Sequence, residues 1–207
     1  MQRPLVPDAP GTRVVGQYLK YVKGAWFLGN ETQRINGTKL IAYEYVPCWL
    51  KWDDGRIVDS IFPEPGKLFP TSAAACGGVD DGPGEWQDSR YLYLSDPDDG
   101  RDFTYGTSSA GGIQAVDGLV QQTNRIRRRG KPGAYPLVEL DTTSYFHKKH
   151  GTMVDKPMLY VRAWVTVDGT PYPTIPIAAT SLLAERLAGS DIRPPVNDLL
   201  DDDIPFN

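Results

Sequence analysis

Aromatic and basic side chains recur, mostly at every second residue, in four short segments of the sequence. Because side chains alternate across a β-strand, residues at this spacing share one face of a sheet. Aromatic rings on such a face can stack on unpaired nucleobases, and Arg or Lys beside them can neutralise phosphates. The candidate residues for this chemistry are Tyr43, Tyr45, Trp49, Lys51, Tyr91, Tyr93, Arg101, Phe103, Tyr105, Tyr160, Arg162 and Trp164.

The opposite faces of these segments are aliphatic. In the first segment that face carries Leu40, Ala42, Val46, Cys48 and Leu50. A sheet needs only one apolar face for stability, so the aromatic face is available for another role. The alternative is that it packs against a second sheet or another subunit, because Tyr and Trp are also good strand formers and core residues.

Basic residues are concentrated between positions 123 and 150, where only Glu139 and Asp141 oppose them. Such a concentration on a nearly neutral domain is typical of a surface that attracts phosphates. We therefore add the basic residues that cluster most closely to the candidate nucleic-acid contacts, namely Arg127, Arg128, Arg129, Lys148 and Lys149.

Metal and catalytic motifs are weak by comparison. Cys48, Cys76, His147 and His150 could supply two sulfur and two nitrogen ligands, but their spacing matches no common zinc module. Two cysteines are too few for a disulfide scaffold, so we expect reduced thiols. We predict neither a metal site nor a cofactor.

Carboxylate pairs occur at Asp53, Asp54 and at Asp80, Asp81, each beside a glycine, which is typical of turns rather than of Mg²⁺ sites. Neither a P-loop nor a nucleophile elbow is present. "TSSAGG" at 107–112 is explained by a helix cap as well as by phosphate binding. These observations favour a protein without enzymatic activity.

The acidic excess of the chain lies at its end. Five aspartates and one Arg follow position 189, which accounts for the whole net charge of −4, and the rest of the chain is balanced. The last seven residues are "DDDIPFN", a short hydrophobic group directly after an acidic run. An acidic arm on a domain with a basic region suggests an interaction segment.

The 207 residues and 40% apolar content suffice for one packed core. The chain has no run of eighteen or more uncharged apolar residues, and "MQRPLVPDAP" lacks the layout of a signal peptide. We expect a cytoplasmic protein, in the bacterial host cytoplasm if it is encoded by a bacteriophage, with no membrane partner.

Short apolar runs separated by Pro and Gly predict a mostly β fold. Asp99-Gly100 favours a hairpin turn, and 62–88 is expected to be a long loop. A single helix should begin at a cap, Ser108 or Ser109, and end at "RIRRRG". The predicted strands are 38–52, 56–61, 90–95, 101–106, 135–140 and 158–167.

The composition changes toward the end of the chain, where Pro-rich segments flank a short helical possibility at 181–187. We expect one mostly β domain with one helix and long loops over 1–188, followed by a disordered acidic tail over 189–207.

The tail resembles the acidic C-terminal tip of bacterial single-stranded DNA-binding proteins, in which acidic residues precede a terminal Ile-Pro-Phe. The resemblance implies that the domain over 1–188 is an OB-like barrel that wraps single-stranded DNA, followed by a flexible linker and a tip that recruits other enzymes. In this chain Asn207 follows the Phe, and the body resembles the family in surface chemistry only, as a divergent bacteriophage-type relative. The implied partner-binding residues are Asp201, Asp202, Asp203, Ile204, Pro205 and Phe206.

We therefore expect a single-stranded DNA-binding protein that protects DNA in replication or recombination. Its tip would recruit host or phage replication, recombination and repair proteins. Two alternatives remain open. One is a nuclease that carries the same tip and gathers carboxylates or histidines around Mg²⁺. The other is a structural domain whose aromatic faces form a homo-oligomer interface.

Overall fold

The computed structural model describes residues 13–29, 34–77, 82–147 and 151–173. These residues form a mostly β fold with one α-helix, as predicted. The helix is α1 (Ala110–Arg128), and a short 3-10 helix lies at Ala73–Ala75. The strands are β1 (Gln17–Val22), β2 (Ala25–Leu28), β3 (Lys39–Asp53), β4 (Arg56–Ile61), β5 (Glu85–Ser95), β6 (Asp102–Thr107), β7 (Tyr135–His147) and β8 (Thr152–Val165).

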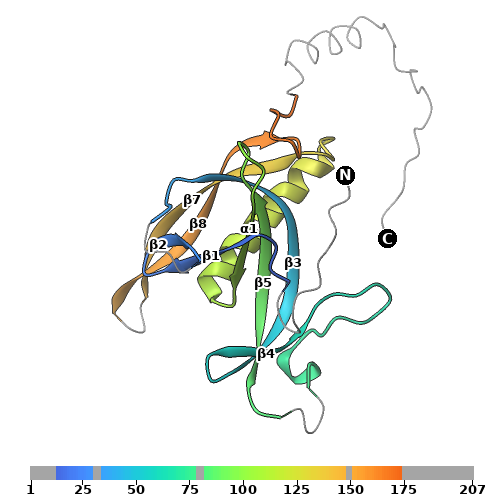
Figure 1. The fold of residues 1–207 in the computed structure, drawn as a ribbon, viewed down its shortest axis with the longest axis vertical. Coiled ribbons are helices and arrows are strands. Elements are labelled where there is room, and N and C mark those ends of the chain that lie inside the picture. The colour runs from blue at the N-terminus through green and yellow to red at the C-terminus, as the bar shows by residue number, and fades with distance from the viewer. Residues whose placement is uncertain (1–12, 30–33, 78–81, 148–150, 174–207) are drawn as a thin grey trace, which may run out of the picture. The chain divides into compact units, whose positions relative to one another are not determined.

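The strands form one sheet in the order β2-β1-β6-β5-β3-β7-β8, with β4 paired to β3 beside this path. The β1 and β6 pair is parallel and the other pairs are antiparallel. The sheet curls into a nearly closed barrel (Figure 1). The long strand β3 is part of its wall and pairs with β5, β7 and β4. With β3 as the first barrel strand, α1 lies between the third strand, β6, and the fourth, β7. The arrangement is that of an OB-like barrel, as expected.

An N-terminal hairpin of β1 and β2 nearly closes the barrel. The indole Nε1 of Trp26 in β2 donates a hydrogen bond of 2.7 Å to the carbonyl of Asp141 in β7. The amide of Gly37 donates to the carbonyl of Leu140 at 2.7 Å, so the connection after β2 also lies against β7. The sequence analysis missed β1 and β2, which are only 6 and 4 residues long.

Helix α1 packs into the barrel through its apolar side. Val116 and Leu119 are buried there against Leu92, Leu140 and other aliphatic residues of the strands. At the start of the helix, the Ser109 hydroxyl accepts a hydrogen bond of 3.1 Å from the amide of Gly112, which confirms the predicted cap. The helix therefore packs one side against the barrel core, and its basic last turn is largely exposed.

A β-bulge in β3 reverses the two faces of that strand. Ala42 pairs with Leu94 but Glu44 pairs with Tyr93, so Tyr43 is an extra residue. Before the bulge, Ala42 faces the barrel interior; after it, Tyr45 does so. The predicted faces of this strand are therefore wrong beyond Ala42.

The aliphatic residues after the bulge lie on the outer side of the sheet. Val46, Cys48 and Leu50 pack there with Tyr91 and Tyr93. The predicted division into one aliphatic and one aromatic face does not hold, because aliphatic and aromatic residues share this outer side.

All six predicted strands exist, with different limits. β4 has the predicted bounds, β5 begins at Glu85, within the predicted loop, and β7 continues past Leu140 to His147. The contacts divide the chain into Met1–Tyr172 and Pro173–Asn207. The predicted boundary at 188, the helix at 181–187 and the tail lie outside the described residues. No helix among the described residues is long and apolar enough to cross a membrane.

Candidate nucleic-acid interface

Six of the predicted contact residues are buried within the domain. Phe103 and Tyr105 point into the barrel core. Tyr91 and Tyr93 are only 2% and 4% exposed on the outer side of the sheet. Trp49 and Lys51 are also buried. The prediction of a continuous exposed face is therefore wrong at these six positions, where five aromatic rings and the Lys51 side chain pack within the domain.

Trp49 and Lys51 are covered by the segment that connects β4 to β5. The indole Nε1 of Trp49 donates a hydrogen bond of 2.8 Å to the carbonyl of Pro70. The Lys51 ammonium group donates to the carbonyl of Gly82 at 3.1 Å and lies 5.9 Å from the ring centroid of Trp86. Because Lys51 is only 3% exposed, it is not placed to neutralise a phosphate.

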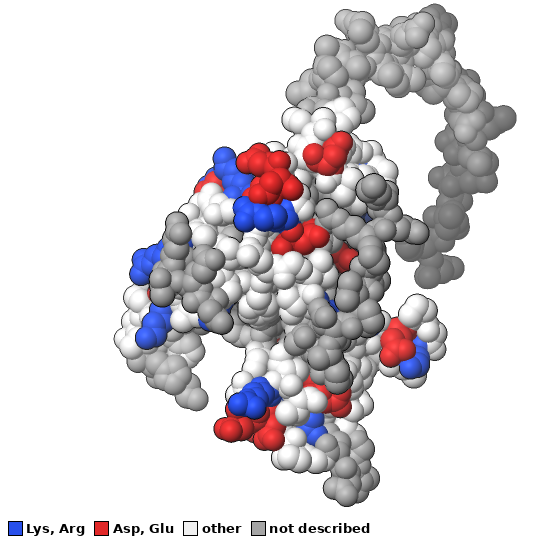
Figure 2. All heavy atoms as spheres, in the orientation of Figure 1, with Lys and Arg blue, Asp and Glu red and all other residues white. Residues whose placement is uncertain are grey.

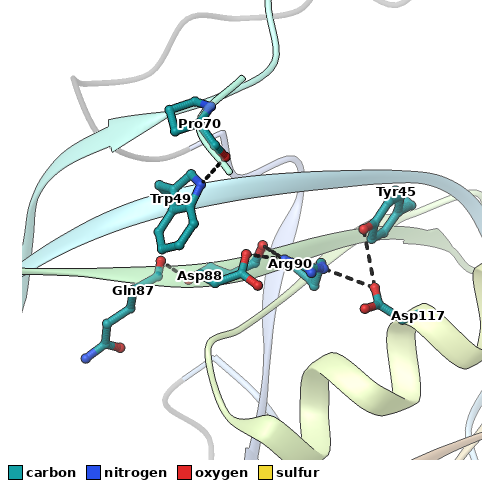
Figure 3. A network of polar contacts seen from close by, with 8 residues as sticks. Tyr45, Trp49, Pro70, Gln87, Asp88, Arg90 and Asp117 are labelled. Atoms are coloured by element: carbon teal, nitrogen blue, oxygen red, sulfur yellow. Dashed lines mark hydrogen bonds and ion pairs between the residues drawn. The ribbon is translucent and has the colours of Figure 1, made fainter. Parts of the chain in front are cut away.

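Tyr45 takes part in a polar network that joins α1 to the sheet (Figure 3). Its hydroxyl donates to Asp117 at 3.3 Å, and the guanidinium Nε of Arg90 donates to the same oxygen at 3.0 Å. Arg90 also forms an ion pair with Asp88. Burial raises the pKa of Tyr45, which keeps the phenol neutral. This network holds β3, β5 and α1 together.

Two of the predicted basic contacts are already paired with carboxylates. The Nε atom of Arg101 lies 2.6 Å from Asp99. Arg162 makes a bidentate pair with Glu139, at 3.0 and 2.9 Å, and its guanidinium lies 5.1 Å from the ring centroid of Tyr160. On the face shown in Figure 2, basic and acidic side chains are likewise interspersed and form no broad basic patch.

The basic run after α1 is only partly available. Arg127 is half-buried; its Nε donates to the carbonyl of Ala134 at 3.3 Å, and its guanidinium lies 5.1 Å from the ring centroid of Tyr135. Arg128 and Arg129 are exposed.

Three more predicted contacts are half-buried or lie outside the described residues. Trp164 is half-buried opposite Pro136 in the β7 and β8 pair. Lys148 and Lys149 lie outside the described residues. Among the predicted basic contacts that the structure describes, Lys51 and Arg127 are at least half-buried, and Arg101 and Arg162 are paired with carboxylates. Arg128 and Arg129 are exposed and form no ion pair with a described residue.

A cavity of about 450 Å³ brings three predicted residues together between β3, the second half of α1 and the start of β7. Tyr43, Tyr45 and Arg127 line it, together with Asn124 and Glu44. The bulged residue Tyr43 is thus one of the residues that line the cavity.

The most exposed aromatic group was not among the predicted contacts. Beyond Leu140, the β7 and β8 strands leave the barrel as a two-stranded hairpin (Figure 1, left). It carries Tyr145, Phe146 and Met153, which are 43%, 59% and 63% exposed. Phe146 and Met153 are directly opposite each other. We call Tyr145, Phe146, Met153 and the nearby Lys156 the aromatic hairpin.

The segment "SYFHKKH" at 144–150 contained a signal for this site, since two aromatic residues precede several basic ones. The predicted strand ended at Leu140 because the following residues, "DTTS", are polar and have no apolar alternation. Apolar and polar residues alternate in a strand only where one face of the strand is buried. The hairpin extends beyond the core, so its residues show no such alternation.

The candidate zinc ligands do not form a metal site in the part of the chain that the structure describes. Cys48 is buried and Cys76 is half-buried, and both are free thiols. His150 lies outside the described residues, and within them no group of three or more His, Cys, Asp or Glu side chains is placed to hold a metal ion. Burial raises the pKa of Cys48 to about 12, so its thiol stays protonated.

The comparisons with known proteins found no match for this chain among protein-family models, curated proteins or solved structures.

Proposed function

We propose that this protein binds single-stranded DNA through the aromatic hairpin, together with the exposed Arg128 and Arg129, and recruits partner proteins through its C-terminal tip. The observation that carries the proposal is the exposure of Tyr145, Phe146 and Met153 on a hairpin that extends from an OB-like barrel.

The position of the hairpin supports this role. OB folds bind oligonucleotides with loops that include the connection between their fourth and fifth strands. The β7 and β8 hairpin is that connection here. Its exposed rings are of the kind that stack on bases, which contributes about 1–3 kcal/mol per base with little dependence on sequence. This favours coating of a single strand rather than reading of a specific site.

The tip supports the second half of the proposal. Asp201, Asp202 and Asp203 precede Ile204, Pro205 and Phe206, in the order found at the acidic tip of bacterial single-stranded DNA-binding proteins. An apolar pocket with a basic rim on a partner would accept such a segment, since the rings and aliphatic groups supply burial and the aspartates supply charge complementarity. Replication, recombination and repair proteins are the proposed partners.

The test is the anisotropy of a fluorescent oligo(dT) titrated with the full chain, with unlabelled single-stranded and double-stranded DNA as competitors. We expect single-stranded DNA to compete and a duplex of equal length to compete far less. Equal competition by both forms, or no binding at low salt, would contradict the proposal.

Two further readouts address the alternatives. Gel analysis of the oligonucleotide with Mg²⁺ present would reveal the cleavage that a nuclease produces. Light scattering with and without DNA would show whether the chain assembles into an oligomer in the absence of any ligand, as a purely structural domain would.

A further inference from the structure

Residues 13–15 lie across the outer side of the sheet before the first strand begins. The amide of Val15 donates a hydrogen bond of 2.8 Å to the Thr104 hydroxyl, and that hydroxyl donates back to the Val15 carbonyl at 2.7 Å. The Tyr93 hydroxyl donates to the carbonyl of Arg13 at 2.8 Å. We call residues 13–15 the strap, since side chains of β5 and β6 hold its backbone.

The strap contacts two members, Tyr93 and Phe62, of a group of aromatic rings. Tyr43 stacks on Tyr93 with 6.3 Å between ring centroids, and Tyr91 lies 5.8 Å from Phe62 and 6.4 Å from Tyr93. The guanidinium of Arg13 lies over the ring of Phe62, 4.5 Å from its centroid. We call Tyr43, Phe62, Tyr91 and Tyr93 the outer aromatic face.

The contact between Arg13 and Phe62 resembles the contact a nucleic acid would make. A planar guanidinium on an aromatic ring occupies the position that a stacked base takes on such rings. Four rings on one side of a sheet, next to an Arg, contain the chemical groups needed for bases and for a phosphate. In the free protein, the strap takes the place of that ligand.

The contacts of the strap are separate from the pairing of β1 with β6. The pairing of β1 with β6 begins at Gln17, and Gly16 separates the strap from that ladder with a φ of +65°. A Cβ atom at Gly16 would lie 1.8 Å from the carbonyl oxygen of Asp102, so only glycine fits the turn. Three hydrogen bonds and apolar contacts hold the strap, whereas the β1 ladder is independent of it.

We propose that the outer aromatic face is a second site for the bases of single-stranded DNA, closed in the free protein by the strap of residues 13–15. This inference rests on the proposed function. DNA reaches the aromatic hairpin first and displaces the strap to extend its contact. The apparent affinity is then reduced by the small fraction of molecules in which the strap is open.

Weakening the strap without removing a ring tests this directly. Tyr93→Phe deletes the hydrogen bond to Arg13 but keeps the aromatic ring, and Thr104→Val deletes both hydrogen bonds to Val15 at nearly constant volume. One net hydrogen bond contributes about 1 kcal/mol, so we expect the full-length Tyr93→Phe variant to bind oligo(dT) about fivefold more tightly and the Thr104→Val variant, which loses two bonds, up to about 30-fold more tightly.

The matched control is Tyr45→Phe, which removes a tyrosine hydrogen bond to Asp117 of α1, away from the strap and from the aromatic hairpin. It should leave the affinity unchanged. Unchanged or weaker binding by both Tyr93→Phe and Thr104→Val, with thermal stability like that of the control, would contradict the proposal that the strap closes the outer aromatic face.

Ultraviolet crosslinking to oligo(dT) locates the contact. Trypsin separates residues 91–101, which hold Tyr91 and Tyr93, from residues 130–148, which hold Tyr145 and Phe146. We expect crosslinks in both peptides and an increase in the first for Tyr93→Phe. Crosslinks confined to 130–148 in every variant would overturn this inference and leave the proposed function intact. Absence of binding and of any crosslink would overturn the proposed function itself.

Discussion

The ammonium group of Lys156 lies 5.9 Å from the ring centroid of Tyr145 and donates a hydrogen bond of 2.9 Å to Gln114 of α1. One side chain thus connects the aromatic hairpin with the helix. The cation stays beside the ring where a phosphate would follow a stacked base. Tyr145 and Lys156 therefore share one face of the hairpin, Phe146 and Met153 lie on the other face, and the rings of both faces are the first to test.

Tyr145→Ala and Phe146→Ala should each weaken binding to oligo(dT). Loss of one stacked base costs about 1–3 kcal/mol, which corresponds to a loss of roughly 5- to 150-fold in affinity. The fold should persist, because both side chains are exposed. The measurement is fluorescence anisotropy, with Leu68→Ala as the control, since Leu68 is fully exposed elsewhere. Wild-type affinity in both variants would exclude the hairpin from the interface.

Replacing Arg128 and Arg129 by Gln should flatten the salt dependence of binding. Each contact with a phosphate of single-stranded DNA contributes about 0.7 to the slope of log affinity against log salt. The double variant should therefore lose roughly 1.4 from that slope. Arg56→Gln on β4 is a control of equal charge change per site. If the slope of the double variant equals that of the control, Arg128 and Arg129 do not contact phosphates and only stabilise the C-terminal end of α1.

Deleting residues 198–207 should tighten DNA binding at low salt. The segment carries Asp198, Asp201, Asp202 and Asp203, which under the proposal would compete with phosphates for basic groups, and salt would screen this competition. Phe206→Ala is the matched control: it keeps every charge, so it should leave DNA affinity unchanged while abolishing capture of a purified repair or replication partner. Capture that survives in Phe206→Ala would contradict the recruiting role of the tip.

Stability should fall in alkaline solution as buried tyrosines ionise. Burial raises the pKa of Tyr93 from 10.0 to about 12, and burial also raises the pKa of Tyr91 and Tyr105. The unfolded chain therefore loses these protons first. The stabilisation is complete below pH 10.0 and is lost as the pH rises through 12, at about 1.4 kcal/mol per pH unit for each such tyrosine.

Urea unfolding at stepped pH values measures this loss, and the ultraviolet absorbance of phenolate reports ionisation. Exposed tyrosines should titrate in the native state, whereas Tyr91, Tyr93 and Tyr105 should titrate only with unfolding. A single titration near pH 10.0 of all 11 tyrosines in the folded chain would contradict the burial of these rings.

Arg90→Met should destabilise the domain by about 2–3 kcal/mol, because it removes charge-assisted hydrogen bonds to Asp88 and Asp117. Arg90 is the member of this network that contacts both carboxylates (Figure 3). Urea unfolding at neutral pH checks the value. Arg101→Met is the control, since the Arg101 ion pairs are on an exposed turn and contribute little. Equal loss in both variants would show that the network adds no stability.

The elements that pack a single apolar face were predictable from the sequence. Six strands and α1 with its Ser109 cap follow from alternation, turn residues and capping chemistry, whereas the OB-like barrel was expected from the resemblance of the tail. β1 and β2 were not predicted, because both are short, "AWFL" of β2 has no alternation, and the β6 partner of β1 is far away in the chain.

The candidate site was harder to predict, for a physical reason that Tyr43 illustrates. A single bulged residue reverses every following side chain, so Tyr45 turned inward while Val46 turned outward. Alternation also identifies a face without stating whether another segment covers it. Tyr91 and Tyr93 were correctly grouped on one face, but the strap and Phe62 bury them, and nothing local to β5 indicates that cover.

The hydrogen bond from Trp26 to Asp141 joins residues 115 positions apart in the chain. During synthesis the N-terminal hairpin leaves the ribosome long before β6 and β7, its partners in the barrel, exist. The barrel therefore closes only after most of the domain has been translated, and the buried indole of Trp26 needs protection until then. Such long-range pairing places folding in the range of milliseconds to seconds, a delay in which a chaperone bound to residues 17–28 would prevent aggregation.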